Sequence, residues 1–183
     1  PEGPPRKESV VAVTANAELI CFNAGQPQRV LERRPLIGLD GGDKLVGIDY
    51  RIARGVLYAL SAAGKLYTLD AAGGRLSPVG SGVPLDLGVQ AVGFDFNPVA
   101  DRIRVVAADG RNWRLHPDTG AVAATDAALR YADGDAAFGQ RAVDDRAHDF
   151  RLGAAVARRR LGPSRSRRLH QQLLVAPVGD DVR

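Results

Sequence analysis

The chain repeats itself with a period in the mid-forties. Residues 47–76 align without gaps with residues 93–122 at a shift of 46, and a third copy begins at Val10 when the shift is 47. Glycines, acidic residues and apolar residues all match in phase, as in Gly47 with Gly93, Asp49 with Asp95, Leu69 with Leu115 and Gly74 with Gly120. A repeat of this length indicates duplicated structural units that stack on one another.

Each copy has the pattern of short β-strands. Residues 56–60 and 103–106 are apolar runs rich in branched side chains, and residues 66–69 alternate apolar with polar residues. Ala63-Gly64 and Asp109-Gly110 separate the two central strands, and we expect tight two-residue hairpin turns there. A second turn precedes a weaker outer strand, so that one unit contains four strands.

Four short strands at this spacing are typical of a propeller blade. We therefore predict an all-β fold of β-propeller-like blade repeats, with about three blades in an incomplete ring and an irregular C-terminal tail. The alternative is a β-sandwich or meander whose internal similarity is accidental. Three blades leave sheet edges open, so self-association through these edges is possible.

Charge divides the chain into regions. Residues 1–140 hold 15 basic and 16 acidic side chains, whereas residues 141–183 hold 10 basic and 5 acidic ones, so the basic character belongs to the C-terminal end. We predict a linker over residues 1–8, a repeat domain over 9–136 and a basic tail over 137–183. The tail is expected to be disordered, although residues 151–161 could form a short helix.

An out-of-frame ending is a second hypothesis for the tail. Codons for residues 169–173 can be chosen so that the frame one nucleotide later reads Tyr-Thr-Asn-Ser-Phe, which fits a strand of the repeat. The tail lacks interleaved aromatic residues, so we expect no nucleic-acid partner. No apolar run is long enough for a membrane span, and Cys21 as the single cysteine excludes an internal disulfide.

Three segments resemble one known family. GFDFNPVADRIRVVAADGRNWRLHPDTG (93–120), VVAVTANAELICFN (10–23) and LVGIDYRIARGVLYALSAAGKLYTLD (45–70) occur in the order found in DUF4394, a bacterial family of secreted domains of unknown function. The resemblance covers roughly residues 9–136. It implies a propeller-like fold and an exported protein, extracellular or periplasmic, although residues 1–8 show no signal peptide. It implies no activity.

Four residues are weak candidates for a binding site. Asp49 and Asp95 recur at the same repeat position, so they could form part of a carboxylate ring that holds a cation at a central channel. The structural alternative is that each carboxylate accepts backbone N–H groups near a strand end. Asp101 and Arg102 could contact a ligand or form an ion pair, although such neighbours are more often a solvated turn.

Other polar residues give weaker signals. The pairs Asp40 with Asp43 and Asp133 with Asp135 do not match the ligand spacing of a calcium loop. The histidines lie far apart, at His116, His148 and His170. Trp113 takes the repeat position of Tyr67, which favours packing over ligand binding.

No catalytic motif is present in the sequence, and we predict no catalytic residue, metal or cofactor. The favoured function is a non-enzymatic binding or scaffold module of an exported bacterial protein, with an unknown partner. The alternative is a metal-dependent propeller hydrolase or lactonase, which would need at least three converging ligands.

Overall fold

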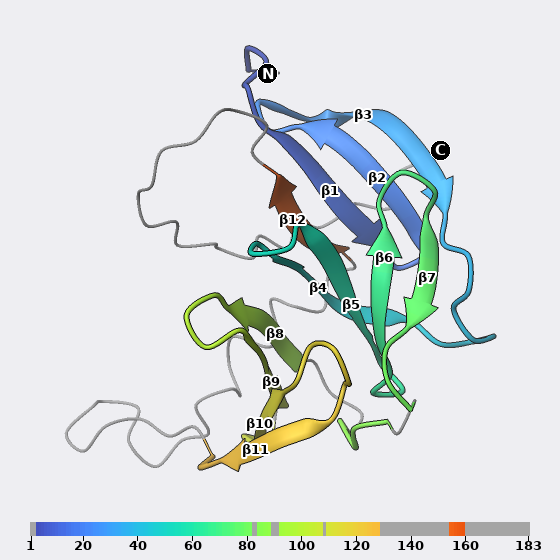
Figure 1. The fold of residues 1–183 in the computed structure, drawn as a ribbon. Helices are drawn as coiled ribbons and strands as arrows, with labels where there is room; N and C mark the ends of the chain where they lie inside the picture. The colour runs from blue at the N-terminus through green and yellow to red at the C-terminus, as the bar shows by residue number, and fades with distance from the viewer. Residues whose placement is uncertain (1–2, 82–83, 89–91, 108, 129–153, 160–183) are drawn as a thin grey trace.

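The structure, a computed structural model, describes residues 3–81, 84–88, 92–107, 109–128 and 154–159. Within these residues every regular element is a strand, and the strands form three antiparallel sheets of four (Figure 1). The first sheet has the order β12 (Ala154–Arg159), β1 (Ser9–Thr14), β2 (Glu18–Asn23) and β3 (Gln26–Pro35). The second has β4 (Leu45–Arg51), β5 (Val56–Ser61), β6 (Leu66–Asp70) and β7 (Arg75–Pro78). The third has β8 (Val92–Asn97), β9 (Arg102–Ala107), β10 (Asn112–Leu115) and β11 (Val122–Asp126).

The second and third sheets are the two halves of the sequence repeat. Asp49 faces Tyr58 in the register of β4 with β5, and Asp95 faces Arg104 in that of β8 with β9, so equivalent residues hold equivalent places. The predicted all-β fold of duplicated four-stranded units is therefore confirmed. No helix of the described residues is long and apolar enough to span a membrane.

Packing of the sheets explains the apolar runs. On β5, Leu57 and Ala59 pack toward the first sheet, whereas Tyr58 and Leu60 pack toward the third. Burial on both faces requires a continuous apolar strand, because no side chain points into water. The apolar residues between the second and third sheets include Leu60, Leu66, Phe94, Ile103, Val105 and Leu115.

The sheets are arranged like blades around a common line. β4 contacts β12 on one side and β8 on the other, and these three strands follow one another down the middle of Figure 1. β8 differs from β5 because its side chains alternate: Phe94 and Phe96 are buried, whereas Asp95 and Asn97 are exposed. The third sheet is thus covered by another sheet on one face only within the described residues.

The hairpin turn between β5 and β6 is longer than predicted. Gly64 has the expected positive φ, at 80°, but Ala63 is not in that region, and Ala62 belongs to the loop as well. The Ser61 N–H donates to the Lys65 carbonyl, and the Gly64 N–H donates to the Ser61 carbonyl, both at 2.9 Å. A three-residue loop of this kind needs one left-handed residue rather than two, and this residue is the glycine.

Residues 154–159 form a strand rather than the helix considered for 151–161. β12 pairs antiparallel with β1, from Ala154 opposite Thr14 to Arg159 opposite Ser9. It takes the place in the first sheet that β4 and β8 hold in theirs. A strand satisfies the N–H and C=O groups along the edge of β1, which a helix would leave unpaired. The other residues of the predicted tail lie outside the described residues, and the domain boundaries stay predictions.

The glycines in phase at 74 and 120 allow neighbouring sheets to approach each other. Both have a positive φ, of 69° and 67°. A Cβ on Gly74 would lie 2.5 Å from the Pro35 carbonyl oxygen, and one on Gly120 would lie 3.0 Å from the Val79 carbonyl oxygen. In each case the chain leaving one sheet passes against the last turn of the next sheet. This repeat position therefore requires glycine for two reasons: the positive φ, and the lack of room for a Cβ.

Candidate functional site

Asp49 connects the second sheet to the third. It lies on β4, is 5% exposed, and accepts the Tyr50 N–H at Oδ1 (2.8 Å) and the Phe96 N–H of β8 at Oδ2 (2.7 Å). Burial, with a smaller contribution from Asp95, raises the pKa of Asp49 to about 6 against the lowering effect of the two N–H donors. The geometry is that of a carboxylate satisfying backbone groups between two blades.

Asp95 lies at the equivalent place on β8 and is exposed. Partial burial raises the pKa of the Asp95 carboxyl group, and the carboxyl group of Asp49 lowers it. The equivalent place on β12 is held by Ala157, which lies opposite Val11 as Asp49 lies opposite Tyr58. Within the described residues, the predicted carboxylate ring is therefore a pair.

Arg51 forms the second connection between these sheets, and the sequence analysis missed it. Its side chain is 4% exposed and bonds to Asp101 through two nitrogens, Nε to Oδ1 at 2.9 Å and Nη2 to Oδ2 at 2.6 Å. Nη1 also donates to Asp118, and the Tyr58 hydroxyl lies within hydrogen-bonding reach. These contacts raise the pKa of Arg51 and lower the pKa of both Asp101 and Asp118. The sequence contained one signal for Arg51: a charged residue at the end of an apolar strand, at the repeat position that Asn97 holds in the next copy.

The structure separates the candidate pair Asp101 and Arg102. Asp101 lies in the β8–β9 turn with a φ of 49°, and its carboxylate is directed to Arg51 of the second sheet. Arg102 donates from Nη1 to the backbone carbonyl of Asp101 at 2.9 Å. The Asp101 carboxylate of the third sheet therefore bonds to Arg51 of the second sheet rather than to the neighbouring Arg102.

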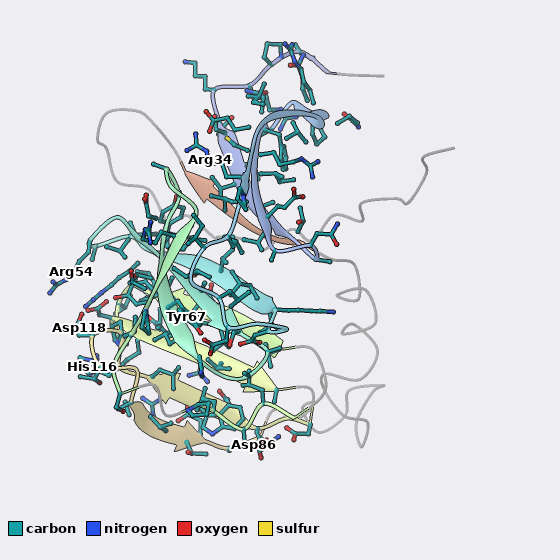
Figure 2. All side chains as sticks on the ribbon, turned by 90° about the vertical axis from the view of Figure 1, so that its right-hand side faces the viewer. Arg34, Arg54, Tyr67, Asp86, His116 and Asp118 are labelled. Atoms are coloured by element: carbon teal, nitrogen blue, oxygen red, sulfur yellow. The ribbon has the colours of Figure 1, made fainter. Side chains whose placement is uncertain are left out.

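The other polar candidates are dispersed. Asp40 pairs with Lys65 at 2.5 Å, whereas Asp43 accepts the Lys44 and Ala63 N–H groups, at 2.8 and 3.1 Å. His116 accepts the Asp118 N–H at Nδ1 (3.3 Å), and both lie with Arg54 on one side of the molecule (Figure 2).

Trp113 packs at the edge of the core between the second and third sheets, and the Arg111 guanidinium lies 5.3 Å from its ring. No group of three or more potential metal ligands occurs in the part of the chain that the structure describes. The candidates Asp133, Asp135, His148 and His170 lie outside that part.

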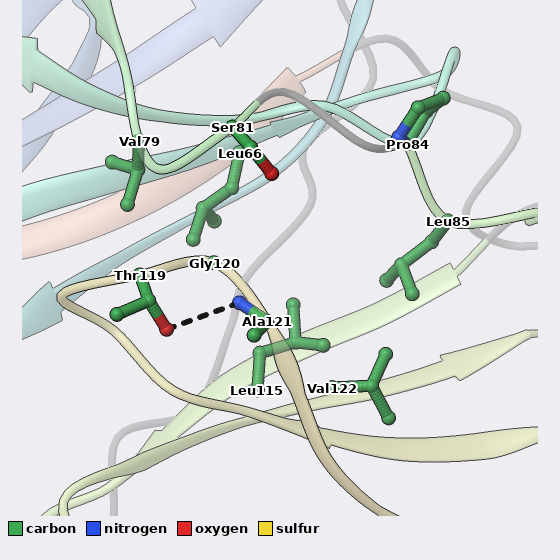
Figure 3. Close-up of a pocket in the computed structure, with 11 residues that line it drawn as sticks. Leu66, Val79, Ser81, Pro84, Leu85, Leu115, Thr119, Gly120, Ala121 and Val122 are labelled. Carbon is green, nitrogen blue, oxygen red and sulfur yellow. Dashed lines mark hydrogen bonds between the residues drawn. The ribbon is translucent and has the colours of Figure 1, made fainter.

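A cleft opens between the outer parts of the second and third sheets. It has a volume of about 260 Å³ and lies between the β6–β7 side of the second sheet and the β10–β11 turn of the third (Figure 3). The wall is mostly apolar, with Leu66 and Leu115 on the inside and Leu85 and Val122 further out. Ser81 and Thr119 add hydroxyl groups, and the Thr119 hydroxyl accepts the Ala121 N–H at 3.3 Å. No sequence motif marks this cleft, because its wall comes from segments of two sheets.

The chain is similar to parts of three longer solved structures. The chain is similar to BamB from Moraxella catarrhalis (17% identity, TM-score 0.42), over 70% of this chain and 35% of that one. It is similar to the periplasmic gluconolactonase PpgL of Pseudomonas aeruginosa (20%, 0.38), over 63% and 34%, respectively. It is also similar to BBS1N, solved in complex with ARL6DN (14%, 0.44), over 68% and 36%. The chain thus spans about a third of the length of each.

No curated protein matches the sequence. One family model does match it, over residues 18–144, and that model describes a domain of unknown function. The matched residues are more than half of the chain and include the second and third sheets entire. On this match the chain belongs to the DUF4394 family.

Proposed function

We propose that this domain is a binding or scaffold module of an exported bacterial protein, and that it holds a partner at the cleft between the second and third sheets. The observation that supports this is that the charged groups between these two sheets bond to other groups of the protein. Arg51 bonds to Asp101 and Asp118, and Asp49 bonds to backbone N–H groups. These groups join the two sheets to each other, and the cleft between the outer parts of the same two sheets has a mostly apolar wall.

The cleft suits an apolar side chain of a protein or peptide partner. Its volume of about 260 Å³ lies below the usual range for sites that enclose a whole cofactor. Apolar walls favour an aliphatic or aromatic group, and the hydroxyl groups of Ser81 and Thr119 at the wall suit the polar backbone that carries it.

Titration with blocked amino acids tests this function. N-acetyl amides of leucine, phenylalanine and serine are added to ¹⁵N-labelled protein, and amide signals are followed by NMR. The leucine or phenylalanine derivative is expected to shift signals of Leu85, Leu115 and Val122, whereas the serine derivative is not, because apolar burial drives the binding.

Val122→Arg places a charge at the cleft and is expected to weaken binding roughly tenfold or more, since desolvating a charge opposes entry. The matched control is Val99→Arg, because Val99 is 95% exposed and does not line the cleft. Equal binding by both variants would contradict the proposal. So would a stoichiometric bound metal together with lactone hydrolysis, the alternative that needs three ligands where Asp49 and Asp95 offer two.

A further inference from the structure

The outer edge of the second sheet already pairs with an extended segment of the same chain. Ile37, which follows the first sheet, forms a parallel bridge with Arg75 of β7. Its N–H donates to the Gly74 carbonyl, and its own carbonyl accepts the Leu76 N–H, both at 2.8 Å. A single extended residue thus satisfies one C=O and one N–H that face outward from an edge strand.

The third sheet has the same two backbone groups at the same place. Gly120 and Val122 take the repeat positions of the two residues that Ile37 bonds in the second sheet. The Ala121 carbonyl accepts the His116 N–H at 2.8 Å, so Ala121 faces β10. Backbone groups alternate in direction along an antiparallel strand, so the Gly120 carbonyl and the Val122 N–H face away from β10.

The chain leaving the second sheet begins along the same path as the chain leaving the first. The Leu36 N–H donates to the Ala17 carbonyl at 2.8 Å. The Leu85 N–H donates at 3.0 Å to the carbonyl of Gly64, which takes the repeat position of Ala17. Leu85 is therefore the structural counterpart of Leu36, and the residue after Leu85 is the one that could act as Ile37 does.

That next residue, Asp86, does not continue to β11. Its carboxylate pairs with Arg111 at 3.0 Å, and its side chain is 86% exposed. Within the part of the chain that the structure describes, no backbone bond joins Asp86 to the edge of β11. The two edges differ in exposure as a result, because Leu76 is 4% exposed whereas its counterpart Val122 is 47% exposed.

The cleft lies directly beside this edge of β11. Gly120, Ala121 and Val122 line it from the third sheet, and Leu85 lines it from the opposite side (Figure 3). A residue that paired with β11 as Ile37 pairs with β7 would lie at the mouth of the cleft. Successive side chains of an extended segment point to opposite faces, so every second side chain of such a segment faces the cleft.

We infer that the partner held at the cleft is an extended peptide segment that pairs with the edge of β11 as Ile37 pairs with β7. One partner residue donates its N–H to the Gly120 carbonyl and accepts the Val122 N–H, and an adjacent aliphatic side chain enters the cleft. Main-chain bonds of this kind supply affinity, and the cleft selects the side chain. This inference rests on the proposed function of the cleft and adds the conformation and the bonding of the partner.

Blocked peptides with the chain's own bridging sequence test the pairing. Acetyl-Leu-Ile-Gly-amide copies residues 36–38, and two N-methylated forms each lack one N–H, that of the isoleucine or that of the glycine. The isoleucine N–H is the donor expected at the Gly120 carbonyl. The glycine N–H is the matched control, because the Gly38 N–H donates no backbone bond within the described residues.

Dissociation constants are measured by NMR titration of the ¹⁵N-labelled intact chain. Methylation at the isoleucine is expected to weaken binding roughly fivefold or more, and methylation at the glycine by less than about twofold, because only the first removes a hydrogen bond. In the saturated complex, amide exchange at Val122 should slow roughly tenfold or more, whereas exchange at Ala124, which faces β10, should not change.

Val122→Pro removes the protein's donor at an outward-facing position, where an edge strand tolerates proline. It should weaken binding of acetyl-Leu-Ile-Gly-amide roughly fivefold or more. The control is Val122→Ala, which loses more of the apolar wall but keeps the N–H, so it should bind the peptide more tightly than Val122→Pro does. If Val122→Pro does not fold, the methylated peptides decide alone, because they need only the intact chain.

Equal effects of the two methylations would overturn this inference, and so would an unprotected Val122 amide in the saturated complex. The same holds if acetyl-Leu-Ile-Gly-amide does not bind although the blocked leucine derivative does. In each of these cases the cleft still binds an apolar side chain, and the proposed function stands. Failure of the blocked leucine and phenylalanine derivatives to bind would instead remove the proposed function itself.

Discussion

At the scale of single residues, two side chains of β4 join the second sheet to the third. Asp49 satisfies a backbone N–H of β8, and Arg51 binds two carboxylates carried by turns of the third sheet. The two contacts differ in kind. A guanidinium with three bonded nitrogens is charged at every accessible pH, whereas the charge of Asp49 depends on pH near 6.

Removing the Arg51 guanidinium is expected to destabilise the domain. Arg51→Met keeps the apolar stem but leaves Asp101 and Asp118 without their partner, at a cost of about 2 kcal/mol in the free energy of unfolding. Urea denaturation at pH 7 measures this cost. The control is Arg54→Met in the exposed β4–β5 turn, which should change stability by less than about 0.5 kcal/mol.

The effect of Arg51→Met should also depend on pH. Arg51 lowers the pKa of Asp101 and Asp118, so the stability from these pairs is complete above their usual pKa, about 4. It is lost as the pH falls through the lowered values, because both carboxylates then take up protons. The difference between the intact chain and the variant should therefore shrink below about pH 4. A constant difference down to pH 2 would contradict the ion-pair explanation.

At the scale of elements, the spacing of the sheets depends on close backbone approach. Ile37 bridges to Arg75 in parallel, with the Ile37 N–H donating to the Gly74 carbonyl at 2.8 Å and the Leu76 N–H donating to the Ile37 carbonyl at 2.8 Å. This bridge ties the chain leaving the first sheet to the outer strand of the second. Gly74 lies at the point where the two segments come nearest, so it sets how tightly they pack.

Alanine at Gly74 should be more damaging than alanine at Gly55. Both glycines have a positive φ, 69° and 65°, but a Cβ at Gly74 would lie 2.5 Å from the Pro35 oxygen, whereas at Gly55 it would meet nothing within 4 Å. We expect a loss of about 1 kcal/mol for Gly55→Ala and at least about 2 kcal/mol for Gly74→Ala. Chemical denaturation of the two variants measures the difference. Equal losses of stability in the two variants would show that glycine is needed at residue 74 only for its positive φ and not for the close approach of Pro35.

The pairing of β12 with β1 can be tested by truncation. A chain that ends at residue 160 keeps β12, and a chain that ends at residue 153 lacks it. In the shorter chain, β1 amides that do not donate to β2 should exchange roughly tenfold faster or more, because each loses a hydrogen bond. Amide exchange followed by NMR compares the two chains. Equal protection in both would show that β12 does not pair with β1 in solution.

At the scale of the whole molecule, the sheets stack like blades, and within the described residues their outer strands have unpaired edges. β3 is the longest strand, and within the described residues no strand pairs with its outer side. Val30 and Leu31 on β3 are 39% and 52% exposed. The same strand carries Arg29, Glu32, Arg33 and Arg34, and charges of this kind limit edge-to-edge pairing without abolishing it.

We expect weak self-association through this edge. Sedimentation velocity should show average mass rising with concentration, and Leu31→Lys should reduce the rise because a further charge opposes pairing of the edges. The control is Ile52→Lys, since Ile52 is 53% exposed but lies in the β4–β5 turn. A chain that stays monomeric at every concentration, or equal effects of both variants, would contradict the expectation.

The sequence predicted the repeating parts of this structure better than the junctions between them. In-phase residues such as Asp49 and Asp95 located the sheets, because the pattern of apolar residues within each strand indicates which of its side chains are buried. Arg51 and its pairing with Asp101 and Asp118 were missed, since these two residues lie 50 and 67 residues away in the chain. The turn at Ala63 was predicted one residue short, because a glycine permits more than one loop length.

What the sequence determined by itself was the content of each blade: strand order, turn positions and the all-β character follow from local pattern and from the period of the repeat. The tertiary structure alone decided how the blades meet. The bond from the Phe96 N–H to Asp49, the Arg51 bonds, the cleft and the place of β12 each join groups from separate sheets or distant segments. The local sequence pattern indicates whether a side chain is buried, because burial follows the period of the strand. It does not indicate which distant group covers that side chain, because this depends on how the sheets pack.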